Sequence, residues 1–131
     1  MSQEIVRARD VMSSTIPSIE GMATAKEAAA IMKELKVSSL IVNKRHENDA
    51  FGLITIQDLI TGVMIPGRDA NMVNVYEIMT KPIISVHADM DIRYVVRLLH
   101  RVSMRRAPVE ENGQLIGIVT LNDLIFEHDL F

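Results

Sequence analysis

The chain has 131 residues, of which 48% are hydrophobic and 24% charged, a composition typical of a folded globular protein and not of a disordered one. Its net charge of −3 disfavours general binding to nucleic acid, and the absence of cysteine excludes disulfides, thiolate catalysis and cysteine-based zinc sites. No apolar run approaches the ~18 residues of a membrane span and no apolar signal segment begins the chain, so we expect a cytoplasmic protein.

The first part of the chain predicts a short strand, a helix and a hairpin. Residues 17–19 form the strand, and Thr24, a residue type that often caps helix N-termini, begins the helix. The polar residues 43–50 have the composition of a loop. The second hairpin strand, at 53–55, runs into a final helix, so the predicted element order is βαββα.

A helix stop and a linker follow this first unit. Pro66 and Gly67 end its last helix, since neither residue favours continuing a helix. The polar residues up to Asn74 predict the linker. We therefore place the first unit at residues 7–66 and the second at residues 74–131.

The second part of the chain predicts the same elements. A strand at 83–86 precedes a helix that Asp91 caps and that carries apolar residues at helical spacing on one face. Asn112-Gly113, a dipeptide typical of tight hairpin turns, joins the next two strands. The second of these strands, at 116–120, leads into the last helix.

Matching segments show that one unit occurs twice. Asp10-Val11-Met12-Ser13 matches Glu77-Ile78-Met79-Thr80, 67 positions further on. The segment from Gly52 to Asp58 matches the segment from Gly117 to Asp123 at an offset of 65, so the first copy has the longer hairpin loop. The sequence therefore predicts a mixed α/β fold of the α+β type, built from tandem βαββα units.

Each repeat carries a Gly-x-x-Thr-x-x-Asp motif where its last strand meets its last helix. The motif residues are Gly52, Thr55 and Asp58 in the first repeat and Gly117, Thr120 and Asp123 in the second. The spacing supports a helix capping box at least as well as it supports a ligand site. In the ligand interpretation, the helix N-terminus and the threonine hydroxyl suit a phosphate, and the carboxylate suits the two hydroxyls of a ribose.

The doubled pattern resembles the tandem CBS (cystathionine β-synthase type) domain pair, or Bateman module. The resemblance rests on Asp10-Val11-Met12, Glu77-Ile78-Met79, the strand Ala107-Pro108-Val109 and both threonine motifs, and it covers roughly residues 7–131. It implies a homodimer that binds an adenosine derivative, such as AMP, ADP, ATP or S-adenosylmethionine, in a cleft between the repeats. Members of the family regulate attached or partner proteins and perform no chemistry themselves.

The resemblance also implies roles for individual residues. Asp58 and Asp123 are expected to bind ribose hydroxyls, with Thr55 and Thr120 beside ribose or phosphate. The expected adenine pocket consists of residues from the first strands and the hairpin, namely Ile16, Ile19, Ile83, Ile84, Val86 and Pro108. For any single one of these apolar residues, a place in the hydrophobic core is the simpler interpretation.

The two repeats differ before the first hairpin strand. The second repeat has Arg105 and Arg106, whereas the first has Ser38 and Ser39. The resemblance implies that basic residues here contact phosphate, a role that the planar guanidinium suits. We therefore expect one phosphate-binding site and a second site that is weaker, empty or filled by an uncharged adenosyl group. The alternative is that both arginines are simply solvated.

These observations predict a regulatory nucleotide-binding protein that signals in trans to an unidentified partner, because the chain has no room for an effector domain. The alternative is a ligand-independent dimerisation module whose threonine and aspartate residues only cap helices. An enzyme is not expected, since no nucleophile with a base and no paired carboxylates are evident. Arg93, Arg97 and Arg101 predict a solvated basic helix face. The histidines lack metal-site spacing, so neither a metal nor a cofactor is predicted: His46, His87, His100 and His128.

Overall fold

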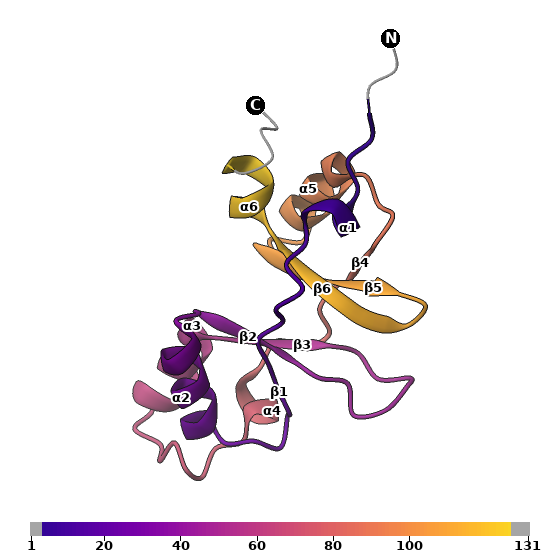
Figure 1. The fold of residues 1–131 in the computed structure, drawn as a ribbon. Coiled ribbons are helices and arrows are strands. Elements are labelled where there is room, and N and C mark those ends of the chain that lie inside the picture. Colours follow the sequence, from indigo (N-terminus) through magenta and orange to yellow (C-terminus); the bar gives the residue numbers. More distant parts are fainter. Residues whose placement is uncertain (1–3, 127–131) are drawn as a thin grey trace. The chain divides into compact units, whose positions relative to one another are not determined.

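The structure is a computed structural model that describes residues 4–126 and contains helices and two three-stranded sheets (Figure 1). In both sheets the first strand runs parallel to the second, and the third runs antiparallel to the second. This duplicated arrangement confirms the predicted mixed α/β fold of two βαββα units. Residues 127–131, which end the predicted second repeat and include His128, lie outside the described residues.

The first repeat forms the first sheet. Its strands are β1 (Ser18–Ile19), β2 (Ser39–Val42) and β3 (Gly52–Thr55). Helix α2 (Ala25–Leu35) connects β1 to β2 and begins as predicted, because the Oγ1 of Thr24 accepts a hydrogen bond from the N–H of Glu27 at 3.1 Å. Ala28 and Met32 lie on the face of this helix that is buried in the core. Residues 43–51 form the connection between β2 and β3, which ends in the buried Phe51.

After β3 the chain enters a helix whose second half is irregular. Helix α3 (Ile56–Leu59) continues directly into the π-helical turn η1 (Ile60–Met64). Pro66 and Gly67 follow the end of this turn, and Gly67 adopts a φ of 74°, a conformation that favours glycine. The predicted helix stop is therefore confirmed.

The second repeat forms the second sheet. Its strands are β4 (Val86–His87), β5 (Arg106–Glu111) and β6 (Gln114–Thr120), and its helices are α5 (Ile92–Arg101) and α6 (Leu121–Phe126). Asp91 caps α5 by accepting the N–H of Arg93 at 2.9 Å. The turn between β5 and β6 has positive φ at Asn112 (53°) and Gly113 (76°), which is the geometry expected for an Asn-Gly hairpin.

The position of the first strand in this repeat differs from the prediction. The strand lies at Val86–His87, not at 83–86. The reason is that Ile83 donates its N–H to the carbonyl of Phe51 at 3.0 Å, so this part of the chain continues along the residues that precede β3. An apolar run alone does not show which sheet its backbone will join.

Each spatial unit combines most of one repeat with the first segment of the other repeat. The middle unit is Pro17–Ile83, and the terminal unit joins the segment up to Ile16 with the residues from Ile84 onward. Short helices begin the two exchanged segments: α1 (Ala8–Val11) packs in the terminal unit and α4 (Val75–Ile78) in the middle unit. The contact-based units therefore divide the chain differently from the sequence repeats.

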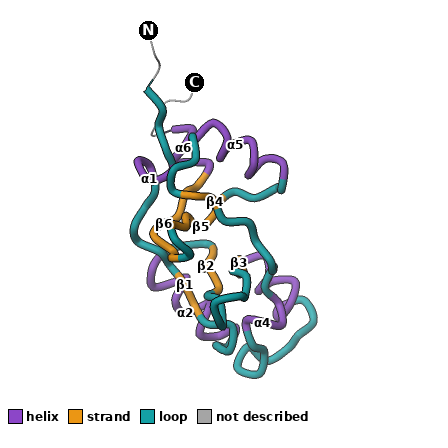
Figure 2. Tube along the Cα trace, turned by 90° about the vertical axis from the view of Figure 1, so that its right-hand side faces the viewer, coloured by secondary structure: helices purple, strands orange, loops and turns teal. Residues whose placement is uncertain are grey.

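The exchanged helices complete two hydrophobic cores. In the terminal unit, Ala8 and Val11 pack with residues of β4, β5, β6, α5 and α6 (Figures 1 and 2). In the middle unit, Val75 packs with Leu40, Ile54 and other residues of the first sheet. Because Ala8 and Val75 are fully buried, each core depends on a segment far away in sequence.

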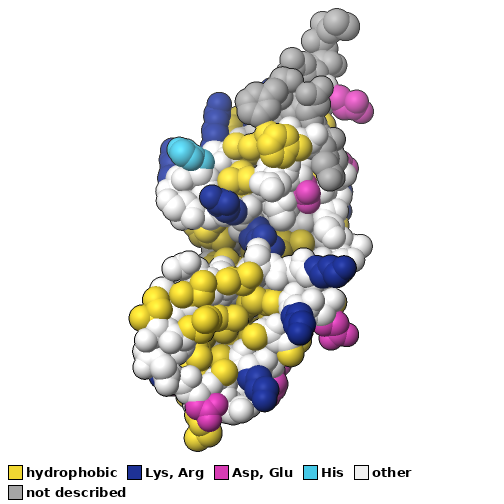
Figure 3. All heavy atoms as spheres, turned by 90° about the vertical axis from the view of Figure 1, so that its left-hand side faces the viewer, with side chains coloured by type: hydrophobic (Ala, Val, Ile, Leu, Met, Phe, Trp, Pro, Cys, Tyr) yellow, Lys and Arg dark blue, Asp and Glu magenta, His cyan; other side chains and the backbone are white. Residues whose placement is uncertain are grey.

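The helices of the middle unit also leave apolar side chains in solvent. Leu35, Ile56, Met64 and Ile65 are each about half or more exposed. Figure 3 shows hydrophobic side chains gathered on one face of the middle unit. Exposed apolar side chains that gather on one face commonly mark an interaction surface.

Candidate functional site

The threonine and aspartate of the first repeat form the predicted capping box. The Oγ1 of Thr55 accepts a hydrogen bond from the N–H of Asp58 at 3.1 Å, and the Oδ2 of Asp58 accepts one from the N–H of Thr55 at 2.9 Å. Both residues are half-buried. The carboxylate of Asp58 is thus already engaged by the backbone of its own helix start.

The corresponding residues of the second repeat lie beside an arginine. The Oγ1 of Thr120 accepts the N–H of Asp123 at 3.1 Å, and Arg106 is the cross-strand partner of Thr120. Arg106 is half-buried; burial lowers the pKa of its guanidinium, and the charge of Asp123 raises it in part. The side chain of Arg105 is exposed, and its backbone carbonyl accepts a hydrogen bond from the N–H of Leu121 at 2.8 Å. A guanidinium, a hydroxyl and a carboxylate therefore gather at this junction.

Ser39 occupies the position of Arg106 in the first repeat. It is the cross-strand partner of Thr55 and is only 4% exposed. Among the described residues, its hydroxyl is buried without a hydrogen-bond partner. The arginine that distinguishes the repeats in sequence thus corresponds to a small neutral group at the equivalent strand position.

The glycines of the two motifs have a packing role. A Cβ on Gly117 would lie 2.8 Å from Cγ of Met12, and a Cβ on Gly52 would lie 2.9 Å from Sδ of Met79. Real Cβ atoms do not approach neighbours this closely, so both methionines pack against bare glycine backbone. The same methionines follow the exchanged helices α1 and α4.

The six expected adenine-pocket residues fall in both units. Ile19 and Ile83 belong to the middle unit, and the other four belong to the terminal unit: Ile16, Ile84, Val86 and Pro108. Ile19 and Val86 are core residues with exposures of 6% and 1%, and Pro108 is buried in β5. Ile16 and Ile83 are half-buried, whereas Ile84 is exposed. Within a single unit, therefore, the structure does not bring the six together.

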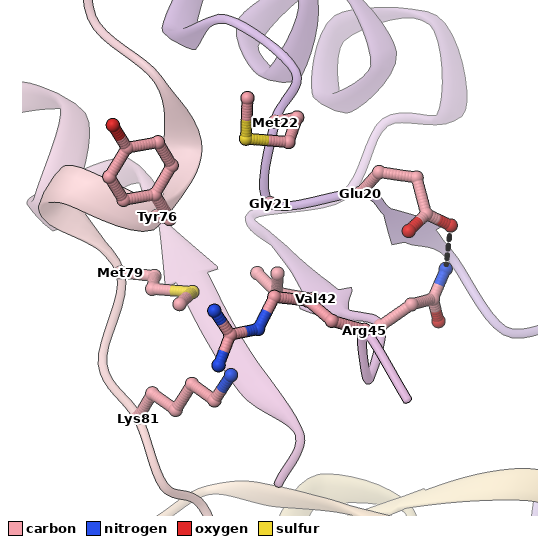
Figure 4. A pocket seen from close by; sticks show the side chains of 9 residues that line it. Glu20, Gly21, Met22, Val42, Arg45, Tyr76, Met79 and Lys81 are labelled. Carbon is pink, nitrogen blue, oxygen red and sulfur yellow. Dashed lines mark hydrogen bonds between the residues drawn. The ribbon is translucent and has the colours of Figure 1, made fainter. Parts of the chain in front are cut away.

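The middle unit contains a pocket that the sequence analysis missed. It has a volume of about 360 Å³ and lies between the end of β1, the end of β2 and the segment from α4 to Lys81 (Figure 4). Its lining residues are Glu20, Gly21, Met22, Val42, Asn43, Arg45, Tyr76, Met79 and Lys81. Apolar and aromatic side chains meet two cationic ones here, as in many ligand sites.

The two cations of this pocket share one carboxylate. Asp49, whose side chain is 7% exposed, accepts hydrogen bonds from Nζ of Lys81 at 2.7 Å and from Nε of Arg45 at 3.0 Å. Hydrogen bonds from Arg45 and then Lys81 hold the pKa of Asp49 well below its usual range. The sequence did contain a signal, since Arg45 and Asp49 are spaced as an ion pair, but nothing local connects them to Lys81.

A metal-binding cluster and a membrane-spanning helix are both absent from the described residues. Within residues 4–126, no three histidine, cysteine, aspartate or glutamate side chains gather as a metal site would require. None of the helices in that range combines the length and the apolar composition needed to cross a lipid bilayer.

Comparison with known proteins relates both repeats to one domain family. The model of the CBS domain matches residues 8–64 and again residues 75–128. The uncharacterized protein MK0525 of Methanopyrus kandleri is 39% identical over 104 residues, which cover 78% of this chain and 52% of that protein. The uncharacterized protein YlbB of Bacillus subtilis is 30% identical over 121 residues, which cover 92% of this chain and 80% of YlbB.

Solved structures show the same likeness. The hexameric CBS-CP12 protein from bloom-forming cyanobacteria matches with a TM-score of 0.86 and 38% identity. The match covers 95% of this chain and 72% of the cyanobacterial chain. The chain thus spans about half the length of the archaeal relative and most of the cyanobacterial structure.

Proposed function

Because this chain belongs to the CBS domain family and contains two copies of the domain, we propose that it is a regulatory protein that binds an adenosine nucleotide. The observation that carries the proposal is the grouping of Arg106, Thr120 and Asp123 at the strand-to-helix junction of the second repeat. These three side chains supply a cation, a hydroxyl and a carboxylate, the groups that a phosphorylated ribose requires.

Each group has a distinct task in this proposal. Asp123 accepts hydrogen bonds from the ribose hydroxyls, and Thr120 lies beside ribose or phosphate. Arg106 binds phosphate, and its partial burial strengthens that attraction because charges interact more strongly away from bulk water. Arg105, which is exposed, adds charge at the open side. The ligand class is therefore AMP, ADP or ATP, in preference to S-adenosylmethionine, which has no phosphate.

The first repeat is proposed to hold a weaker ligand or none. Ser39 replaces the phosphate-binding arginine, and the carboxylate of Asp58 already accepts a backbone N–H. The unpaired hydroxyl of Ser39 is nevertheless a group that water or an uncharged adenosyl ligand would satisfy.

We further propose that the protein forms a homodimer and regulates a separate partner protein. The exposed apolar side chains of the middle unit support self-association, and the cyanobacterial CBS-CP12 relative is itself hexameric. A nucleotide changes the output only if it binds one arrangement of the protein more tightly than another.

Calorimetric titration with AMP, ADP, ATP and S-adenosylmethionine tests the site. Arg106→Ala and Asp123→Ala should each weaken AMP binding by about tenfold or more, since each removes a charge-assisted hydrogen bond. Arg97→Ala, which removes an exposed arginine of α5, is the matched control and should bind as the wild type does. Tight binding that survives both Arg106→Ala and Asp123→Ala would contradict the proposed site.

The second candidate is a ligand-independent interaction module. The complete capping box at Thr55 and Asp58 favours it, because that geometry needs no ligand to explain the motif. This function predicts that no nucleotide raises the melting temperature. It also predicts that truncating the apolar residues Met64 and Ile65 changes the oligomeric state, as measured by sedimentation.

A further inference from the structure

The pocket of the middle unit has walls that suit a flat apolar molecule. Tyr76 and Met22 stand at its mouth with exposures of 52% and 73%, and Figure 4 shows both side chains beside the cavity. Val42 and Met79 line it more deeply. Methionine side chains adapt their shape, and an aromatic ring offers a stacking surface, so such walls accommodate a planar ring.

The charged side of the pocket suits one negative charge. Figure 4 shows the guanidinium of Arg45 and the ammonium of Lys81 close to each other beside Met79. Asp49 takes hydrogen bonds from both, but one carboxylate balances only one of two cations and uses only part of their N–H donors. The exposed Glu20, which accepts a hydrogen bond from Asn43 at 3.0 Å, lies on the rim and disfavours a ligand with several negative charges.

The terminal unit makes the same backbone contacts at the equivalent place with different side chains. The N–H of Tyr76 bonds the carbonyl of Gly21 at 2.9 Å, and the N–H of Arg9 bonds the carbonyl of Ala88 at the same distance. Tyr76 therefore corresponds to Arg9, and by the repeat offset Met22 corresponds to Asp89.

In the terminal unit these two positions form an ion pair. Nη2 of Arg9 lies 2.8 Å from Oδ1 of Asp89 and also pairs with Glu111. The fold thus permits this position to be occupied by the protein's own side chains. In the middle unit, apolar side chains replace the ion pair and a cavity remains.

We propose that the pocket of the middle unit binds a small organic monoanion with a planar apolar body. The apolar part lies against Tyr76, Met22 and Met79, and the anionic group contacts Arg45 and Lys81. A volume of about 360 Å³ is at the small end of the range for ligand pockets, ~300–1,000 Å³, so one or two fused rings fit. The inference is independent of the proposed nucleotide site, which uses residues of the other unit.

A pair of isosteric probes separates charge from shape. 2-Naphthoate and 2-naphthamide have the same ring and nearly the same size, but only the first carries a negative charge at neutral pH. We expect 2-naphthoate to bind saturably in a fluorescence titration and at least about tenfold more tightly than the amide, because a charge-assisted hydrogen bond is lost in the amide.

A graft of the terminal unit's ion pair locates the binding. The double variant Met22→Asp/Tyr76→Arg places the Asp89 and Arg9 chemistry at the mouth of the pocket, and both positions are exposed enough to tolerate it. We expect it to weaken 2-naphthoate binding about tenfold or more through lost apolar contact, since the grafted charges compensate each other as an ion pair. The control Met72→Asp/Tyr94→Arg makes the same changes at exposed positions outside the pocket and should bind as the wild type does.

Several outcomes would overturn the inference. Equal affinity for the acid and the amide would remove the anion site, and unchanged binding by the graft variant would remove the location. A third outcome is that 2-naphthoate shows no saturable binding. If the wild type is then a dimer in sedimentation and the graft variant is a monomer, the pocket binds a second copy of this chain. Displacement of 2-naphthoate by AMP, or its loss in Asp123→Ala, would merge this site with the proposed nucleotide site.

Discussion

The two units of this protein build equivalent corners from the same backbone contacts and from different side chains. In each unit an exchanged helix donates matching hydrogen bonds to the loop after the first strand: Val75 and Tyr76 in the middle unit, Ala8 and Arg9 in the terminal unit. The side chains then diverge, with a cavity lined by Tyr76 in one unit and an ion-pair network around Arg9 in the other.

The strand-to-helix junctions differ in the same way. The register of each hairpin places a threonine opposite position 39 or position 106, but Ser39 is small and buried whereas Arg106 is charged. A duplicated fold therefore preserves main-chain geometry, because backbone hydrogen bonds do not depend on side-chain identity. Binding chemistry is free to differ between the copies.

The largest expected effect is the loss of stability when a motif glycine is replaced by alanine. The loss in the terminal unit is compared with that in the middle unit. Gly117→Ala should destabilise the terminal unit by about 2–3 kcal/mol, because its Cβ would meet not only Sδ of Met12 but also the inner atoms Cγ and Cβ, at 2.8 and 3.0 Å. Gly52→Ala should cost less, since its closest contact is the outer Sδ atom of Met79 at 2.9 Å. Urea denaturation measures both. Partial recovery in Gly117→Ala/Met12→Ala would confirm the cause, and equal losses in the two single variants would refute it.

The next prediction compares the ion pairs of the two corners in acid. Arg45 and Lys81 hold the pKa of Asp49 well below its usual range, and Arg9 lowers the pKa of Asp89. Each carboxylate therefore contributes stability above its ordinary pKa of about 3.9, and that contribution is lost as the pH falls below this value.

Asp49→Asn should lower the melting temperature at pH 7 more than Asp89→Asn does, because the side chain of Asp49 is 7% exposed and that of Asp89 is 53% exposed. The Asp49→Asn variant should also lose less stability than the wild type between pH 6 and about pH 3. Thermal melts across this range measure both effects. A wild type and a variant with parallel acid profiles would show that the Asp49 ion pair does not contribute.

A smaller effect separates the two junctions. Asp58→Ala should cost about 1 kcal/mol, the usual contribution of a helix cap, and leave nucleotide affinity unchanged. Asp123→Ala should instead lower nucleotide affinity. Gln57→Ala, at an exposed neighbouring position of α3, is the control for stability. Loss of AMP binding in Asp58→Ala would mean that the two junctions are functionally alike.

The smallest effect concerns the two hairpin connections. Inserting Gly-Ser after Glu47 should cost about 1 kcal/mol or less, because it adds little closure entropy and breaks one hydrogen bond, from the N–H of Asp49 to the carbonyl of His46. The same insertion between Asn112 and Gly113 should cost more, since it breaks a tight turn with positive φ at both residues. Equal losses in chemical denaturation would show that the long loop is as constrained as the turn.

Much of the fold could be predicted because its signals are local. Thr24 and Asp91 cap the helices that they were predicted to begin, and Asn112-Gly113 forms the expected turn. These residues act on backbone groups within a few positions, so their effect is readable from the sequence. The strand predicted at 83–86 was misplaced because Ile83 bonds Phe51, a partner that no local pattern identifies.

The candidate sites were predicted only in part for the same reason. The motif and the arginine pair were visible as a repeat and as a departure from it. The pocket was not, because Tyr76 and Lys81 come from the start of the second repeat, whereas Met22, Arg45 and Asp49 come from the first repeat. Residues of two different repeats are adjacent in this pocket only after folding.

The amino-acid sequence by itself determined the duplication, the order of elements within each copy and the helix caps. It also showed that only the second repeat has an arginine pair before its first hairpin strand. These properties follow from residue identity and short-range spacing. Tertiary structure alone decided which preceding segment completes which core, why Gly52 and Gly117 must be glycine, and that one corner contains a cavity while its counterpart contains an ion pair. The physical reason is that burial and charge pairing join residues distant in sequence, and the chain reveals those neighbours only when it is packed.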